Sequence, residues 1–234
     1  MKQTLMQIFQ EGFRLFFLKI EQSFYGLIDF IQVAFYYYSK NFQFMKADLF
    51  LRSFYLFDSP YSISKRFSVE KKEHNLYTYG ETLISSIDII SKTCEIEAYD
   101  HVFELGCGIG RTCFWLHFFI RCKVTGIDYI GQFISRANKI KERLNLDRIN
   151  FIQENYLNVD LTEATVIYLY GTTLDEIEIE QLIEKFKTLQ PGTKVITVSY
   201  PLTDYCSNDL FELMKCFSVK YPWGSAEIYM QIKK

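Results

Sequence analysis

The stretch of sequence that decides the fold is Val102-Phe103-Glu104-Leu105-Gly106-Cys107-Gly108-Ile109-Gly110. Its first four residues predict a short buried strand, and the three alternating glycines that follow predict a tight loop. Residues 111–121 then have the pattern of a helix. Because glycine has no side chain, such a loop lets the backbone approach a compact ligand closely. The stretch therefore predicts a strand, a ligand-binding loop and a helix.

Strands and helices continue to alternate after this unit. Further strands are expected at 122–128, 149–153, 165–170 and 194–200, and further helices at 131–144 and around 177–186. The tail predicts a helix over 209–215 and then two strands, 217–221 and 227–232. This order predicts an α/β fold, a Rossmann-like seven-stranded, mostly parallel sheet with a C-terminal antiparallel hairpin. The ligand is expected over the carboxyl ends of the strands.

The N-terminal part differs in composition. Of the 234 residues 49% are hydrophobic and 18% aromatic, and the aromatic residues gather in 1–61. Charged residues interrupt this part too often for a membrane span or a secretory signal. We expect residues 1–75 to form a helical cap and residues 76–234 to form the ligand-binding domain. Within the cap, apolar side chains recur at the spacing of an amphipathic helix, at Phe9, Phe13, Phe16, Phe17, Ile20, Phe24, Ile28 and Ile31.

Three interpretations of this aromatic stripe stay open. It packs on the domain or on a second copy of the chain, which would give a homo-oligomer through residues 1–61. Alternatively it lies on a membrane surface as an interfacial helix, or it docks to another partner. The sequence alone does not choose among these three.

Charge and cysteine content argue against several classes of function. The net charge of −2 supplies no basic field that would attract a phosphate backbone, so no nucleic-acid partner is expected. The six cysteines form no Cys-x-x-Cys pair, and the three histidines show no metal-ligand spacing. We therefore expect no metal and a reducing, cytoplasmic location, with peripheral membrane contact as the alternative.

The glycine loop also discriminates among nucleotide-like ligands. A dinucleotide fingerprint would need a third glycine where Arg111 stands, and a P-loop would need a Gly-Lys pair where the chain has Gly110-Arg111. Asp128 closes the next predicted strand, at the position from which a carboxylate can accept hydrogen bonds from both hydroxyls of a ribose. Together these features favour a ligand with a ribose and no diphosphate.

With these motifs, residues 76–234 resemble the class I S-adenosylmethionine-dependent methyltransferases. Glu104–Gly110 matches the first motif of that family, and Gly126-Ile127-Asp128-Tyr129 matches its ribose-binding motif. The resemblance implies S-adenosyl-L-methionine as the cofactor. It implies cofactor contacts from these motifs and from the residues after the third strand, namely Glu104, Gly106, Cys107, Gly108, Gly110, Asp128, Tyr129, Asn155 and Tyr156.

A narrower resemblance concerns two shorter segments. Tyr79-Gly80-Glu81-Thr82 is similar to a segment of the non-SET histone lysine methyltransferases, and Tyr168–Thr172 looks like the fourth motif of those enzymes and of the small membrane-associated lysine methyltransferases that modify ATP-synthase subunits. The Asn-Asn-Phe element of the former is absent at Tyr170-Gly171-Thr172. This resemblance adds four cofactor-binding candidates, namely Tyr79, Glu81, Thr82 and Tyr170.

The candidate residues indicate how methyl transfer would proceed. The sulfonium of the cofactor already activates the methyl group, so the protein mainly has to align an acceptor and exclude water. Tyr170 and Thr172, at the carboxyl end of the fourth strand, are the candidates for lining the transfer site. We expect in-line methyl transfer to a protein lysine. The alternatives are a small apolar or lipid-like acceptor, or a non-catalytic scaffold that binds the cofactor.

Overall fold

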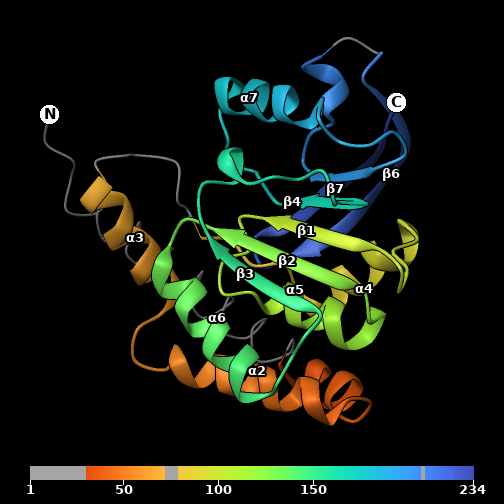
Figure 1. Cartoon of the computed structure of the whole chain (residues 1–234). Coiled ribbons are helices and arrows are strands. Elements are labelled where there is room, and N and C mark those ends of the chain that lie inside the picture. Colours follow the sequence, from red (N-terminus) through yellow and green to blue (C-terminus); the bar gives the residue numbers. More distant parts are fainter. Residues whose placement is uncertain (1–29, 72–78, 207–208) are drawn as a thin grey trace, which may run out of the picture.

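The computed structural model describes residues 30–71, 79–206 and 209–234. A single seven-stranded sheet forms its centre, with the strand order β3-β2-β1-β4-β5-β7-β6 (Figure 1). The strands are β1 (His101–Leu105), β2 (Lys123–Asp128), β3 (Ile149–Gln153), β4 (Val166–Leu169), β5 (Lys194–Val198), β6 (Phe211–Tyr221) and β7 (Gly224–Lys233).

Strand direction follows the predicted pattern. The first five strands are parallel to one another, while β7 runs antiparallel to both β5 and β6. β1 lies between β2 and β4, with Glu104 opposite Gly126 on one side and Tyr168 on the other. The predicted Rossmann-like fold with a C-terminal antiparallel hairpin is confirmed.

Helices cover both faces of the sheet (Figure 1). On one face α7 (Glu176–Phe186) buries Leu182 and Phe186 against β1, β4 and β5. On the other face lie α4 (Ile84–Thr93), α5 (Arg111–Trp115) and α6 (Gly131–Arg143). The apolar faces of these helices form the two halves of the core, and each large side chain buried there stabilises the fold by about 1.5–3 kcal/mol.

The N-terminal helices pack on the same face as α5 and α6. They are the π-helix η1 (Val33–Tyr38), α2 (Phe42–Phe54) and α3 (Pro60–Lys71). Asn41 caps α2, because its side-chain oxygen accepts a hydrogen bond from Phe44 N at 3.0 Å. Phe44 and Leu51 are almost fully buried and belong to the core that α5 and α6 share. Buried residues between Val33 and Ile63 thus belong to the same core as α5 and α6.

Some predictions about this part fall outside the described residues. The stripe from Phe9 to Ile28 and the proposed boundary near residue 75 are among them. Ile31 is described, and its side chain is exposed. Among the residues described, no helix combines the length and the apolar character that a membrane crossing requires.

Two expected elements differ from the structure. The helix expected over 209–215 is wrong, because β6 starts at Phe211 and pairs with β7 along its whole length, with an irregularity between Leu213 and Lys215. Hydrogen bonds to a neighbouring strand override the local helix-like pattern there. The helix expected over 111–121 begins as α5 but continues as a π-helix, η2 (Leu116–Ile120), which ends at Arg121 in the left-handed conformation.

Candidate functional site

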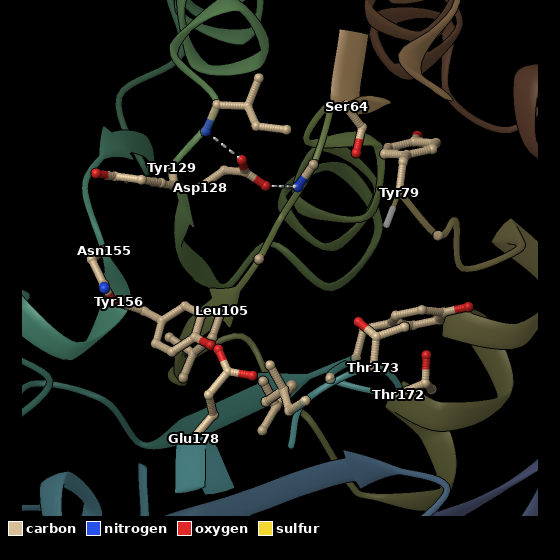
Figure 2. A pocket seen from close by; sticks show the side chains of 18 of the residues that line it. Ser64, Tyr79, Leu105, Asp128, Tyr129, Asn155, Tyr156, Thr172, Thr173 and Glu178 are labelled. Atoms are coloured by element: carbon tan, nitrogen blue, oxygen red, sulfur yellow. Dashed lines mark hydrogen bonds between the residues drawn. The ribbon is translucent and has the colours of Figure 1, made fainter. Parts of the chain in front are cut away.

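A cavity of about 260 Å³ opens at the carboxyl ends of β1, β2 and β4 (Figure 2). Leu105, Asp128 and Leu169, the last residues of these strands, all line it. Its position is the one expected for a ligand in a doubly wound sheet. The remaining lining residues are Ser64, Tyr79, Gly80, Gly106, Gly108, Tyr129, Ile130, Phe133, Glu154, Asn155, Tyr156, Leu157, Tyr170, Gly171, Thr172, Thr173, Leu174, Glu178 and Gln181.

The glycine loop forms one wall of the cavity. Gly106 and Gly108 have φ angles of 76° and 54°, a region that residues with a side chain rarely adopt. A Cβ on Gly106 would meet no atom within 4 Å, so the backbone there faces open space, whereas a Cβ on Gly108 would lie 2.9 Å from the Tyr79 ring. The loop is anchored by hydrogen bonds of 2.9 Å from Gly106 N and Cys107 N to Ile127 O. Its backbone is thus presented directly to a ligand.

Asp128 connects this loop to the start of α6. Its Oδ2 accepts a hydrogen bond from Gly108 N and its Oδ1 accepts one from Ile130 N, both at 2.8 Å (Figure 2). Burial raises the pKa of Asp128 to about 6, although the two backbone hydrogen bonds oppose the rise. Each carboxylate oxygen has two lone pairs, so one acceptor position on each oxygen remains for a hydroxyl of a ligand.

Three residues continue the wall beside Asp128. Tyr129, Asn155 and Tyr156 all line the cavity (Figure 2). Asn155 caps the short helix η3 (Tyr156–Asn158), because its Oδ1 accepts a hydrogen bond from Leu157 N at 2.9 Å. Burial, reinforced by the nearby Glu178, raises the pKa of Tyr156, which keeps its phenol neutral. These residues give this side of the cavity a mixture of aromatic rings and one amide.

The opposite wall is aromatic. Tyr79 is 91% buried and its ring packs edge-on against Tyr61 of α3, with centroids 5.0 Å apart. Tyr170 accepts a hydrogen bond on its Oη from Trp223 Nε1 at 2.7 Å, and Trp223 stacks on Tyr221. Thr172 follows Tyr170 and also lines the cavity. The structure therefore places both predicted transfer-site residues in the cavity lining, just after the end of β4.

Five of the predicted cofactor-binding residues lie outside the cavity lining: Glu81, Thr82, Glu104, Cys107 and Gly110. Thr82 Oγ1 lies 2.8 Å from Tyr168 Oη within the core, and Cys107 is buried below the loop. Gly110 caps α5, and a Cβ there would lie 2.6 Å from the ring of Phe151. Glu81 contacts Arg111. These residues support the wall rather than form it.

Glu104 is the most buried charged group of the motif. Its carboxylate accepts hydrogen bonds from Thr112 Oγ1 at 2.8 Å and from Cys113 Sγ at 2.9 Å. Burial raises its pKa to about 7, while the two hydrogen bonds oppose the rise. The side chain faces α5, so in this structure it links β1 to the helix that follows the loop.

Several lining residues were not predicted from the sequence. Ile130 and Phe133 follow Asp128 at the start of α6, and Glu178 and Gln181 lie in the first turns of α7. Their position just after the carboxyl ends of β2 and β4 is a signal that would have found them. Ser64 of α3 has no such signal, because only packing brings that helix to the cavity.

The charged side chains described in the cavity lining are all acidic. Asp128, Glu154 and Glu178 contribute three carboxyl groups, and the described residues of the lining include no lysine, arginine or histidine. Among the residues that the structure describes, no three histidine, cysteine, aspartate or glutamate side chains lie close enough together to hold a metal ion. The cavity thus suits an organic ligand that carries positive charge.

Comparison with known proteins adds independent information. The model of a family described as "Methyltransferase domain" matches residues 96–223. The sterol 24-C-methyltransferase ERG6 of Saccharomyces cerevisiae is 26% identical over 133 residues, which cover 53% of this chain and 35% of that protein. A protein-lysine N-methyltransferase of Saccharolobus islandicus is 26% identical over 117 residues, 49% of this chain and 71% of the relative.

Solved structures share the fold. An RNA methyltransferase from Salinibacter ruber, in complex with S-adenosyl-L-homocysteine, superposes with a TM-score of 0.52 at 20% identity, over 65% of this chain and 93% of the other.

The chain matches only part of most of its curated relatives. In four of them, which include the sterol methyltransferase, the matched region covers between 30% and 40% of the relative's length. The likeness therefore concerns the domain around the cavity.

Proposed function

Since the chain belongs to the methyltransferase-domain family, we propose that it transfers a methyl group from S-adenosylmethionine to the amine of a protein lysine. The resemblance to the class I S-adenosylmethionine-dependent methyltransferases, drawn from Glu104–Gly110 and Asp128, is confirmed. S-adenosylmethionine, the cofactor that this resemblance implied, is bound in the structure of a magnesium protoporphyrin IX methyltransferase from Synechocystis that shares this fold. The observation that carries the proposal is the cavity, which combines the glycine loop and Asp128 with an aromatic wall in which the described residues carry no cation.

The residues of the cavity fit this cofactor. When bound, S-adenosylmethionine supplies a methyl group on a positively charged sulfur, which needs no covalent nucleophile from the protein. The carboxylate of Asp128 can accept hydrogen bonds from the two ribose hydroxyls, and the backbone at Gly106 leaves room for the methionine part. Tyr79 and Tyr170 line the other side of the cavity.

The wall of the cavity favours a cationic acceptor. A lysine ammonium would enter a cavity lined by three carboxyl groups and by the rings of Tyr79 and Tyr170. It would have to lose one proton to solvent before its neutral nitrogen attacks the methyl carbon, with S-adenosylhomocysteine as the leaving group. A methylammonium product would gain about 0.5–2 kcal/mol from cation–π contact with such rings. Among the described lining residues, an acceptor with phosphate groups would meet acidic side chains and no basic one, which disfavours nucleic acid. The similarity to a protein-lysine N-methyltransferase agrees with this choice.

A second candidate is a lipid-like acceptor reached from a membrane surface. Phe35 and Phe57 are 80% and fully exposed, and Lys40 and Lys46 lie over the rings of Tyr36 and Phe42. The only acidic residue between positions 30 and 57, Asp48, is buried. Exposed aromatics next to cations suit the boundary of an anionic bilayer. The similarity to a sterol methyltransferase favours this candidate.

Transfer of a labelled methyl group tests both candidates. Purified protein is incubated with methyl-labelled S-adenosylmethionine and a lysate separated into protein, lipid and small-molecule pools, with Asp128→Ala as the inactive control. Label on protein, located at lysine by peptide analysis, supports the first candidate, and label in the lipid pool supports the second. Binding of the cofactor without transfer to any pool would point to the scaffold function instead.

Two solution measurements address location and assembly. Co-flotation with vesicles of anionic phospholipid, but not with neutral vesicles, would support peripheral membrane contact. Light scattering decides whether the exposed aromatics join two copies of the chain. The cytoplasmic location stays a prediction, which fractionation of cells would test.

A further inference from the structure

A buried ion-pair network lies directly behind the glycine loop. Arg111, the first residue of α5, is 5% exposed and follows Gly110. Its Nε donates to Asp48 Oδ1 at 2.8 Å, its Nη2 to Asp48 Oδ2 at 3.3 Å, and its Nη1 to Glu81 Oε1 at 3.3 Å. One guanidinium thus joins three segments, the N-terminal helix α2, the loop at Glu81 that leads into α4, and the end of the glycine loop.

Asp48 fixes the position of this guanidinium. Its side chain is fully buried and also accepts hydrogen bonds from Tyr38 Oη at 2.6 Å and from Arg52 Nε at 3.1 Å. Burial acts to raise the pKa of Asp48, but Arg111 and Arg52 outweigh it and hold the pKa at about 2. The carboxylate is therefore charged at neutral pH, and its four hydrogen bonds leave Arg111 little freedom to move.

Glu81 belongs to a segment that makes contacts with both walls of the cavity. The ring of Tyr79 lies against Gly108 of the loop, and Gly80 lies so close to Tyr170 that a Cβ there would stand 2.4 Å from its ring. Tyr79 and Gly80 line the cavity, whereas Glu81 turns toward Arg111. Three successive residues therefore touch the loop, the end of β4 and the buried cation.

We infer that Arg111 is a positioning residue for the cofactor site, held in place by Asp48 and acting through Glu81. The planar guanidinium has donors in a fixed fork, so it can serve Asp48 and Glu81 at once, which the single ammonium of a lysine cannot do with the same geometry. When this link is lost, Glu81 is released, and Tyr79 and Gly80 no longer hold the wall against the loop. The N-terminal helix α2 is thereby part of the machinery that shapes the cavity. This inference rests on the proposed binding of S-adenosylmethionine in that cavity.

Calorimetry with S-adenosylhomocysteine tests the inference without any acceptor. The variants are Arg111→Lys, Asp48→Asn and Glu81→Gln, each measured well below its own melting temperature. Asp100→Asn is the control, since Asp100 is also buried and accepts hydrogen bonds from Thr165 Oγ1 at 2.7 Å and Glu97 N at 2.8 Å, but lies just before β1, at the end of the strand away from the cavity. We expect the control to melt earlier with its Kd within about twofold of wild type, and each of the three variants to raise the Kd about tenfold.

The double variant Arg111→Lys/Glu81→Gln separates positioning from direct contact. If Arg111 acts through Glu81, the double variant binds no more weakly than either single variant, because both substitutions break the same link. Additive losses would mean that Glu81 contacts the ligand by itself and would overturn the inference. Folded Arg111→Lys and Glu81→Gln proteins that bind like wild type would also overturn it, even when Asp48→Asn does not fold. Absence of binding by wild type would instead overturn the proposed function.

Discussion

The two walls of the cavity are built in different ways. We call Gly106, Gly108 and Asp128 the loop wall, and Tyr79, Tyr170 and Thr172 the aromatic wall. The loop wall comes from neighbouring strands and is held by backbone hydrogen bonds, such as those from Gly106 N and Gly108 N. The aromatic wall is held by side-chain contacts between distant segments, such as Tyr170 with Trp223.

This difference has a consequence for function. The loop wall tolerates few substitutions, because its geometry depends on positive φ angles and on one carboxylate. A wall of side chains can change residue by residue without loss of the fold. We therefore expect substitutions in the loop wall to weaken cofactor binding strongly, and substitutions around Tyr170 and Thr172 in the aromatic wall to change how the acceptor is used.

The largest effect is expected for Gly108→Val. The substitution forces a β-branched side chain into a left-handed conformation and against the Tyr79 ring. We expect the Kd for S-adenosylhomocysteine to rise about 100-fold or more, with an almost unchanged far-ultraviolet dichroism spectrum. Gly192→Val is the matched control, because Gly192 has a φ of 89° with no atom within 4 Å of its Cβ position. Equal losses of binding in the two variants would remove the loop from the site.

A smaller loss is expected for Asp128→Ala. The change removes the carboxylate that would accept hydrogen bonds from two ribose hydroxyls. It also removes the hydrogen bond from Gly108 N to Asp128 Oδ2. We expect a rise in Kd between about 10-fold and 100-fold by calorimetry. Glu154→Gln, in the same cavity lining, should change the Kd by less than about threefold. A protein that binds NAD but shows no heat with S-adenosylmethionine would contradict the assignment of the loop wall.

The pH dependence of binding should follow Asp128. Its pKa of about 6 in the free protein means that the carboxylate is ionised above this pH and protonated below it. Because the ribose hydroxyls need the ionised acceptor, the Kd should be constant above about pH 7 and rise by up to tenfold for each pH unit below about 6. Calorimetry across this range should show a flat profile for Asp128→Asn. A wild-type profile that is equally flat would contradict the role of Asp128.

The smallest effect is expected in the aromatic wall. Trp223→Phe removes the hydrogen bond to Tyr170 Oη but keeps an aromatic ring beside Tyr221. With the acceptor identified by label transfer, we expect its KM to rise about two- to fivefold. The Kd for S-adenosylhomocysteine should stay at the wild-type value. A change of that Kd with an unchanged acceptor KM would show that Tyr170 serves the cofactor, as the resemblance at Tyr79-Gly80-Glu81-Thr82 and Tyr168–Thr172 implied.

The loop wall was accessible from the sequence because it is local. Gly106, Gly108 and Asp128 stand at the ends of two strands that their own patterns reveal, and parallel pairing of Leu105 with Ile127 brings these ends together. Ser64 and Trp223 could not be assigned in this way. Ser64 lies on a helix that is distant in sequence from the cavity strands, and Trp223 lies at the tip of a hairpin. Neither residue stands at a spacing from a motif that would indicate contact with the cavity. For the same reason the helix predicted from the pattern at 209–215 was wrong, since pairing with β7 decides the conformation of β6.

The sequence by itself determined the α/β alternation, the glycine loop, the carboxylate after β2 and the kind of ligand that this combination suits. Only the tertiary structure decided that Glu81 faces Arg111 instead of the cavity, that α2 supplies Asp48 to the same guanidinium, and that Trp223 reaches Tyr170. The physical reason is the range of the interactions. Backbone conformation and strand ends follow from neighbouring residues, whereas a buried cation or an aromatic contact is set by whichever distant segments pack together.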